Sequence, residues 1–212
     1  MRYDRRALRF LDPNDRALAR TYREEVRTAL SLVDCLLNGE LASYASSELT
    51  TGRRLYELLR QHGVQDLAAL REGLGAAELA RLLEQPNVAA AAEFARGIRE
   101  RAGGCAVVMT PAFFTSPGWN QSEYLAFWET LIRSRFKALH FNASWEYSNG
   151  CAFEFAVAQS EGLPTFDASG QPLTRGAGIE RLAAAARELA AAGFDAGGLH
   201  RALGWLTAPA PS

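Results

Sequence analysis

The sequence predicts an α/β fold, a doubly wound and mainly parallel sheet with extra helices at the N-terminus and at 64–100. Three observations support this prediction. Short apolar runs with the length of strands recur along the chain, turn-forming residues follow each run, and helix patterns separate one run from the next. Strands that alternate with helices form parallel sheets, and such sheets bind ligands at the carboxyl ends of their strands.

Length and composition describe an ordinary domain. The 212 residues, 48% apolar and 22% charged, suffice for a single α/β domain over 1–212. Within it we expect an N-terminal helical extension at 1–39, a helical insertion at 64–103 and a disordered tail at 207–212. The net charge of −1 and the pI near 6.3 argue against a nucleic acid polymer or an acidic membrane as partner. The N-terminus lacks an apolar leader, so we expect a cytoplasmic protein.

The three cysteines, Cys35, Cys105 and Cys151, stand singly in apolar runs without the spacing of a zinc site. We expect them to be reduced core thiols. No metal and no cofactor are predicted from the sequence.

The first half of the chain is mainly helical. Asp12-Pro13 predicts the start of a long amphipathic helix that ends at Asn38-Gly39. A weak strand pattern follows at 41–47, then a hydroxyl-rich loop at 46–54 and a helix that begins at 53. From 64 to 103 the pattern is helical, and breaks at Gly73, Gly75 and Pro86 predict short, separate helices.

The second half contains the clearer strands. Residues 105–110 form an apolar run that Pro111 stops, and Asn120 with Glu123 resembles a capping box before an aromatic-rich helix. The next strand is predicted at 136–141, followed by a polar turn at 142–150 and a helix that Gly162 closes. A last strand at 163–166 precedes helices at 179–192 and 195–206.

Glu154 is the most informative residue of the chain, because it is the only charge between Cys151 and Ser160. Its neighbours on the helix surface are small or apolar, so its carboxylate is expected to be buried. Burial of an unpaired carboxylate is costly or raises its pKa, so such a group usually has a partner or a task. The alternative is a glutamate that the helix dipole merely stabilises.

Two groups of residues are candidates for binding a substrate near Glu154. Hydroxyls, free N–H groups and arginines near a helix N-terminus suit a phosphate or a sugar, although such clusters are more often plain loops and caps. Aromatic residues in strand-end loops could wall a nucleobase. The candidate binding residues are Tyr44, Ser46, Ser47, Thr51, Gly52, Arg53, Arg54, Phe113, Trp119, Trp145, Ser148, Asn149 and Gly150.

The order of these pieces resembles the nucleoside 2-deoxyribosyltransferase-like superfamily, and especially its DUF4406-like branch of bacterial proteins. The resemblance covers about 41–166, interrupted by the extra helices. Its most specific part is the S-x-G-x-x-x-E spacing of Ser148, Gly150 and Glu154. It implies a Rossmann-like fold and cleavage or exchange of the N-glycosidic bond of a nucleoside or nucleotide.

The resemblance also implies roles for single residues. Glu154 would attack or electrostatically stabilise the anomeric carbon, as in retaining glycosidases. Serine at position 148 is the residue of the family's nucleotide hydrolases, near a 5′-phosphate, whereas the exchange enzymes usually carry Asp. Active sites of the family are usually completed by a neighbouring subunit, so a homodimer or larger homo-oligomer is implied.

One departure from the family pattern concerns protonation of the leaving base. The family often has an Asp near the end of the preceding strand, where this chain has Asn142, and an amide cannot protonate a base. Asn142 is kept as a second catalytic candidate that holds the base. Glu146, Glu48 or His140 could supply the proton, although a histidine inside a strand is more often structural.

The first hypothesis is therefore an N-glycoside hydrolase of nucleoside 5′-monophosphates. The alternatives are a nucleoside deoxyribosyltransferase and a non-catalytic module that binds or senses a nucleotide with the same pocket. A weaker alternative is a partner-binding or assembly protein, which predicts exposed apolar patches on the extra helices.

Overall fold

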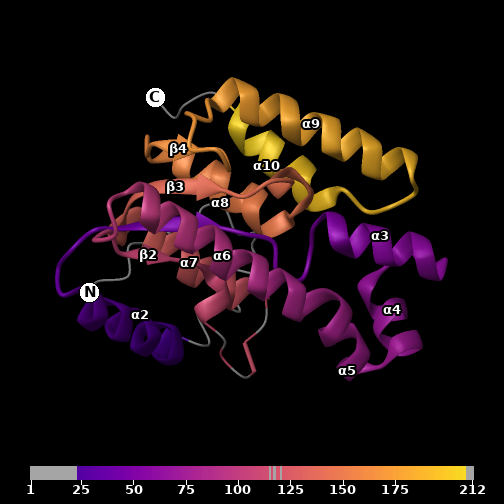
Figure 1. The fold of residues 1–212 in the computed structure, drawn as a ribbon. Coiled ribbons are helices and arrows are strands. Elements are labelled where there is room, and N and C mark those ends of the chain that lie inside the picture. The colour runs from indigo at the N-terminus through magenta and orange to yellow at the C-terminus, as the bar shows by residue number, and fades with distance from the viewer. Residues whose placement is uncertain (1–22, 115, 117, 120, 209–212) are drawn as a thin grey trace.

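β1 (Ala42–Ser46) is an inner strand of a parallel sheet in the computed structural model, which describes residues 23–114, 116, 118–119 and 121–208. The other described strands are β2 (Val108–Met109), β3 (Phe136–Phe141) and β4 (Thr165–Phe166). Their order across the sheet is β2-β1-β3-β4, and every neighbouring pair is parallel. The predicted α/β class with a doubly wound, parallel sheet is confirmed (Figure 1).

The two long strands end side by side. Ser46 pairs with Phe141 in the register of β1 and β3, and the N–H of Asn142 donates to the carbonyl of Ser46 at 3.2 Å. The chain leaves β1 toward one face of the sheet and β3 toward the other. Such a point, where the connections diverge, is where open α/β sheets bind their ligands.

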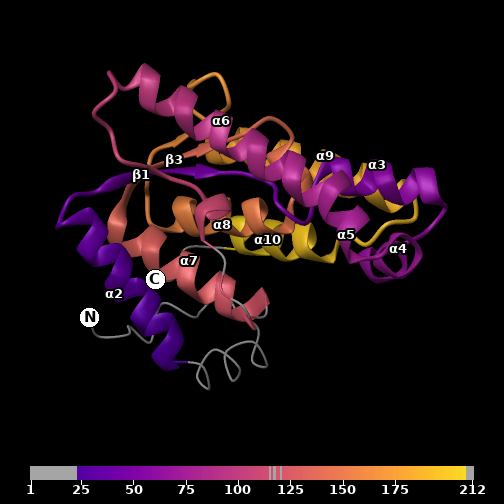
Figure 2. The same cartoon turned by 60° about the horizontal axis from the view of Figure 1, so that its bottom comes forward.

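One face of the sheet is covered by α6 (Gln85–Arg101), as Figure 2 shows. Ala95 and Ile98 of α6 form a small apolar cluster with Ala45 and Val108 of the two strands beneath. The connection from β1 to α6 consists of three shorter helices and a π-helical segment. These are α3 (Arg53–His62), α4 (Leu67–Leu74), α5 (Ala76–Leu79) and η2 (Ala80–Glu84).

The predicted helix break at Pro86 is wrong, because the chain is helical without interruption from Ala76 to Arg101. Proline lacks the N–H that an α-helix would direct to the fourth residue before it. Here the π-helical segment ends one residue before Gln85, so Pro86 lies in the first turn of α6, where prolines are tolerated. The predicted break before Ala76 is present, at Gly75 with φ +79°.

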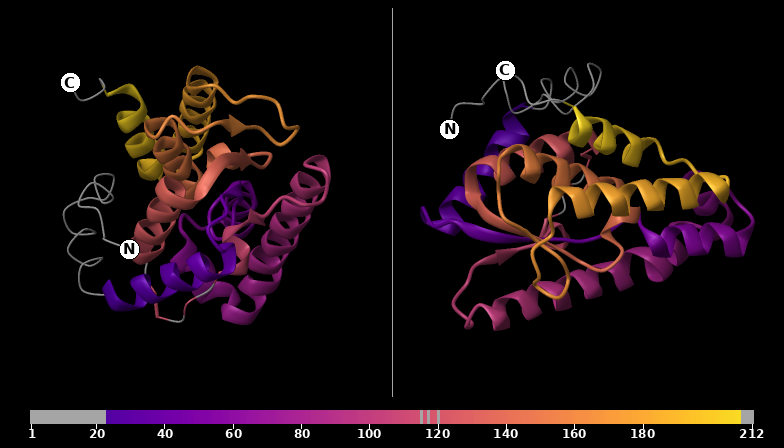
Figure 3. Two further views of the ribbon diagram at one scale, coloured as in Figure 1. Left: turned by 90° about the vertical axis from the view of Figure 1, so that its left-hand side faces the viewer. Right: turned by 90° about the horizontal axis from the view of Figure 1, so that it is seen from above.

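The opposite face carries α7 (Gln121–Arg135) and α8 (Asn149–Ser160), with α10 (Gly197–Thr207) packed on α8 and α9 (Arg175–Ala191) on α10 (Figure 2). Helix α2 (Arg23–Leu37) packs on α7. Figures 1 and 3 show that α2 and the group α3 to α5 lie at opposite ends of the molecule. The group α3 to α5 follows directly on the carboxyl end of β1.

The outer strands are shorter than predicted. β4 begins at Thr165 because Pro164 has no N–H to donate, although its carbonyl accepts from the N–H of Leu139 at 3.0 Å. β2 has a partner on one side alone and follows two glycines with positive φ, so only two of the six predicted residues pair. The predicted helix start at Asp12-Pro13, the cap at Asn120 and the end of the predicted tail lie outside the described residues.

The exposure of the cysteine side chains corrects one prediction. Cys35 and Cys105 are exposed and Cys151 alone of the three is buried, so the prediction of three core thiols is wrong for two of them. Leu32 and Leu36 of α2 are 60% and 82% exposed. None of the helices in the described ranges has the length and apolarity needed to cross a membrane.

Candidate functional site

Glu154 lies buried in the second turn of α8, with 5% of its surface exposed. Both of its carboxylate oxygens accept hydrogen bonds from β1. The hydroxyl of Tyr44 donates to Oε1 at 2.7 Å and the hydroxyl of Ser46 donates to Oε2 at 2.6 Å. Side chains two residues apart on a strand point to the same face, so a single strand supplies both donors. Three predicted site residues are thus brought together.

Burial of Glu154 raises the pKa of its carboxyl to about 7, although the hydrogen bonds from Ser46 and Tyr44 act in the opposite direction. Loss of hydration disfavours the ionised form, while donors aimed at the oxygens favour it. Burial, followed by the nearby charge of Glu154, keeps the pKa of Tyr44 well above its ordinary value. Tyr44 therefore acts as a neutral hydrogen-bond donor, and Glu154 is close to half ionised at neutral pH.

Ser148 caps the N-terminus of α8, because its hydroxyl accepts from the N–H of Cys151 at 3.4 Å. The hydroxyl of Thr51 lies 3.1 Å from that of Ser148 and accepts from the N–H of Asn149 at 3.3 Å. The loop after β1 and the start of α8 are thus joined by hydroxyl groups. Thr51 and Ser148, two of the predicted binding residues, are therefore close together. Ser148 is only 3% exposed and also caps the helix, which is the structural role that such hydroxyl residues more often have.

The two arginines of the loop point to different partners. The guanidinium of Arg53 lies over the ring of Tyr147, 4.9 Å from its centroid, and donates to the Tyr147 hydroxyl at 3.3 Å. That hydroxyl in turn donates to the carboxylate of Glu188 on α9. Arg53 is therefore held by Tyr147 beside the start of α8.

Arg54 connects the loop to the helical insertion. Its Nε donates to Oδ1 of Asn87 at 3.1 Å, and Nδ2 of Asn87 donates to the carbonyl of Leu49 at 2.8 Å. Asn87 is 6% exposed and lies in the first turn of α6. The insertion thus anchors the loop that carries the predicted binding residues, and Arg54 has a structural partner there.

Two side chains that follow β1 and β3 each have one buried oxygen without a hydrogen-bond partner. These are the hydroxyl of Ser47 and Oδ1 of Asn142, which follow Ser46 and Phe141 in adjacent strands. Gly52 has φ +135° and lies against the side chain of Glu48. Ser47, Asn142 and Gly52 therefore all lie at the carboxyl edge where the sequence predicts the site.

Asn149 and Gly150 have less specific surroundings. A Cβ on Gly198 of α10 would lie 2.2 Å from Oδ1 of Asn149, so the amide of Asn149 packs against α10. A Cβ on Gly150 would meet the hydroxyl of Ser148 at 3.8 Å, an ordinary contact. No protein atom therefore lies close enough to require glycine at position 150.

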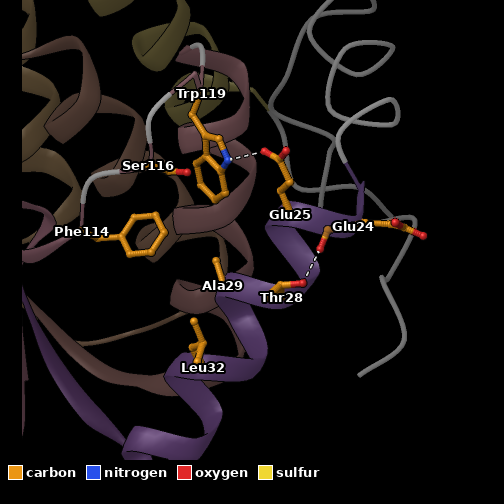
Figure 4. Close-up of a pocket in the computed structure, with 8 residues that line it drawn as sticks. All are labelled: Glu24, Glu25, Thr28, Ala29, Leu32, Phe114, Ser116 and Trp119. Atoms are coloured by element: carbon orange, nitrogen blue, oxygen red, sulfur yellow. Dashed lines mark hydrogen bonds between the residues drawn. The ribbon is translucent and has the colours of Figure 1, made fainter.

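The three predicted aromatic walls have different surroundings in the structure. Trp145 is fully buried and packs against Phe141 and Phe155, so it offers no open face to a base. Phe113 is 69% exposed on the 3-10 turn η3 (Pro111–Phe113). Trp119 lines a separate pocket between α2 and the loop after β2, where its indole N–H donates to Glu25 at 3.2 Å (Figure 4). Base stacking by Trp145 is not supported by this arrangement.

Two groups near the site, Tyr147 and Glu188, were not predicted, whereas Glu48 was named from the sequence as a possible proton donor. Tyr147 and Glu188 accompany Arg53, and Glu188 comes from a helix far along the chain that no local pattern connects to the loop. Glu48 is buried beside Gly52, with 8% of its surface exposed. A glutamate in a loop of small hydroxyl residues is the signal that marks Glu48 in the sequence.

His140 fits its structural alternative. Its ring stacks on Phe166 at 4.9 Å, and burial lowers its pKa, helped by the charge of Arg101. It lies in β3 between residues that face the other side of the sheet. His140 is therefore a neutral packing residue.

Comparisons with known proteins give no match: no protein-family model, no curated protein and no solved structure is similar to this chain.

Proposed function

We propose that this protein is an N-glycoside hydrolase that cleaves the bond between base and sugar of a nucleoside 5′-monophosphate. The observation that supports it is Glu154, a buried carboxylate at the carboxyl edge of a parallel sheet, held by the hydroxyls of Tyr44 and Ser46. Cleavage of an N-glycosidic bond passes through an oxocarbenium-like state that a fixed carboxylate stabilises. The same arrangement fits the superfamily that the sequence resembles.

In this proposal the ionised form of Glu154 attacks the anomeric carbon or stabilises its positive charge. Two short hydrogen bonds orient the carboxylate without neutralising it, because neutral hydroxyls donate both. The low polarity around a buried group strengthens its attraction to the developing charge. Activity should rise with pH through about 7, where Glu154 ionises.

The start of α8 supports a substrate with a 5′-phosphate. Helix N-termini favour anions, and the hydroxyls of Ser148 and Thr51 lie there together with the guanidinium of Arg53. The phosphate would replace contacts that these groups now make with one another. A nucleoside deoxyribosyltransferase would use the same carboxylate and differ in the acceptor, which would be a second base in place of water.

The test is the release of free base from a panel of ribo- and deoxyribonucleoside 5′-monophosphates and from the matching nucleosides, followed by chromatography. We expect release from monophosphates but not from nucleosides, and a loss of at least about 1000-fold in Glu154→Gln, since the amide cannot carry the charge. Exposed Glu180 of α9 provides the control Glu180→Gln, which should retain full activity. Unchanged turnover in Glu154→Gln would contradict the assignment. A second base added to the mixture distinguishes exchange from hydrolysis.

A non-catalytic nucleotide-binding module is the second candidate. It is favoured by the near-complete enclosure of Glu154, whose two oxygens are already satisfied by protein donors. Such a carboxylate can serve the fold alone. A nucleotide that raises the melting temperature without any release of base, in the wild type as in Glu154→Gln, would support this candidate over the hydrolase.

A further inference from the structure

Glu48 is a second buried carboxyl group beside the site, and cleavage by Glu154 alone gives it no role. It follows by two residues the Ser46 that holds Glu154, and it is 8% exposed. Both glutamates lie close to the thiol of Cys151: burial raises the pKa of that thiol first, and the charges of Glu154 and Glu48 raise it further. Glu48 and Glu154 therefore both lie at the carboxyl edge of β1, near Cys151.

Gly52 and α3 fix the position of Glu48. A Cβ on Gly52 would lie 2.2 Å from Oε2 of Glu48, so the carboxyl group occupies the space that a side chain at position 52 would fill. The backbone N–H of Arg53, at the start of α3, donates to the same carboxyl group. The side chain is thus held in one place, as a group that reacts with a bound substrate must be.

Burial favours the protonated form of Glu48 over the ionised form. Burial raises its pKa to about 7, and the carboxylate of Glu146 raises it too, while the Arg53 N–H and the charges of Arg53 and Arg54 lower it. Glu146 lies on the 3-10 turn η4 (Trp145–Tyr147) after β3, and its Oε2 is buried without a partner. A carboxyl group that is near half protonated at neutral pH is suited to donate a proton.

We propose that Glu48 is the general acid that protonates the departing base, a role that rests on the proposed function. The carboxylate of Glu154 forms a bond to the anomeric carbon as the bond from that carbon to the base nitrogen breaks, and the electron pair goes to the base. The proton of Glu48 moves to the base, which leaves neutral. Glu48, now ionised, takes a proton from a water molecule that attacks the anomeric carbon and releases Glu154.

Because Glu154 acts in its ionised form and Glu48 in its protonated form, the proposed mechanism operates only in a narrow pH range. Glu154 must be ionised, so activity rises with pH through its pKa, whereas Glu48 must be protonated, so activity falls with pH through its own. Both values are about 7, and the profile of kcat/KM is therefore a narrow bell centred near pH 7. In the variant Glu48→Gln, kcat/KM should no longer fall at high pH.

The test compares two substrates in the variants Glu48→Gln and Glu154→Gln. One is guanosine 5′-monophosphate. The other is its N7-methyl derivative, whose cationic base leaves without needing a proton. Glu48→Gln should reduce kcat on the first by about 100-fold or more. It should change the rate of base release in the first turnover of the second by less than about threefold, since that step needs no proton, whereas the later attack of water, for which Glu48 is the base, slows on both substrates. Glu154→Gln should abolish both reactions, and Glu40→Gln, at an exposed position before β1, should change neither.

Each outcome decides a separate question. Equal losses in the first-turnover rate of base release on both substrates in Glu48→Gln would overturn the acid role and leave Glu48 as a cap of α3. No base from these two substrates or from the panel of other monophosphates with the wild-type protein would overturn the proposed function and this inference with it. If Glu48→Gln fails to fold, Glu146→Gln gives the answer: removing its charge should move the falling side of the pH profile to lower pH. An unmoved falling side would exclude Glu48 as the acid.

Discussion

Tyr44 and Glu154 are joined by one hydrogen bond although 110 positions separate them in the chain. The ring of Tyr44 is fixed between Phe136, 4.8 Å away, and Trp128, 5.1 Å away, so its hydroxyl has little freedom to leave the carboxylate. The apolar part of the side chain thus belongs to the core and its polar end to the site. Tyr44 is accordingly the residue where packing and chemistry are most directly connected.

Replacing Tyr44 with Phe keeps the packing and removes one donor to Glu154. We expect the rising side of the pH profile to move to higher pH, because a donor to the ionised form lowers the pKa. At pH values below the midpoint of this rising side, kcat/KM of Tyr44→Phe should be about 10- to 100-fold lower than that of the wild type, which is the effect of losing one hydrogen bond to a charged group.

Tyr56→Phe is the matched control, since Tyr56 is buried in α3 against Phe194. Its pH profile should be that of the wild type. An identical profile for Tyr44→Phe and Tyr56→Phe would show that the hydroxyl of Tyr44 has no part in ionisation of the site.

Single residues also show what the sequence could and could not reveal about the site. Glu154 was identifiable because a lone charge among small and apolar helix neighbours has to be buried. The donors to Glu154 depend on which strand lies beneath α8, and the buried state of Trp145 depends on α8 packing over η4. Neither is contained in a local pattern, and Trp119 faces α2 for the same reason.

Among the elements, α9 offers the sharpest test of packing. A Cβ on Gly178 would lie 2.2 Å from the ring of Phe155, which packs on Trp145 in the core. We expect Gly178→Ala to lower the free energy of unfolding by about 1–3 kcal/mol, the cost of overfilling a packed contact. Denaturant unfolding measures this difference.

The same helix provides the control. Gly176 lies in the first turn of α9 and a Cβ there meets no atom within 4 Å. Gly176→Ala should stabilise the protein by up to about 1 kcal/mol, because alanine restricts the unfolded chain and favours helix. If Gly178→Ala and Gly176→Ala changed the free energy of unfolding equally, contact with Phe155 would not be the cause of the effect at position 178.

Elements with strong local patterns were predictable and those that depend on neighbours were not. β3 was predicted over the residues at which it occurs, and α3 ends where Gly63 adopts the left-handed conformation of a helix cap. β2 is shorter than its apolar run because pairing needs a second strand beside it. The continuous helix through Pro86 depends on a π-helical turn that no sequence pattern announces.

For the whole molecule, two raised carboxyl pKa values predict how stability depends on pH. Glu48 and Glu154 have folded values of about 7 against 4.5 as the ordinary value, so the folded state binds more protons between these limits. The contribution of these two groups to the free energy of unfolding is fully present below about pH 4.5 and is lost as pH rises through about 7. The loss is roughly 3 kcal/mol for each buried group that must ionise.

Urea unfolding from pH 5 to pH 8 tests this prediction. The free energy of unfolding should fall across this range in the wild type and much less in the double variant Glu48→Gln, Glu154→Gln, whose amides do not ionise. Equal slopes for the two proteins would mean that other groups determine the pH dependence.

The alignment of β1 with β3 has a consequence for how the chain finds its native state. A slip of one residue would turn Tyr44 and Ser46 to the opposite side of the sheet. Glu154 would then be enclosed without a donor, an arrangement whose desolvation penalty nothing offsets. The native register of β1 and β3 is therefore favoured by the two hydrogen bonds to Glu154 in addition to the pairing of the strands themselves.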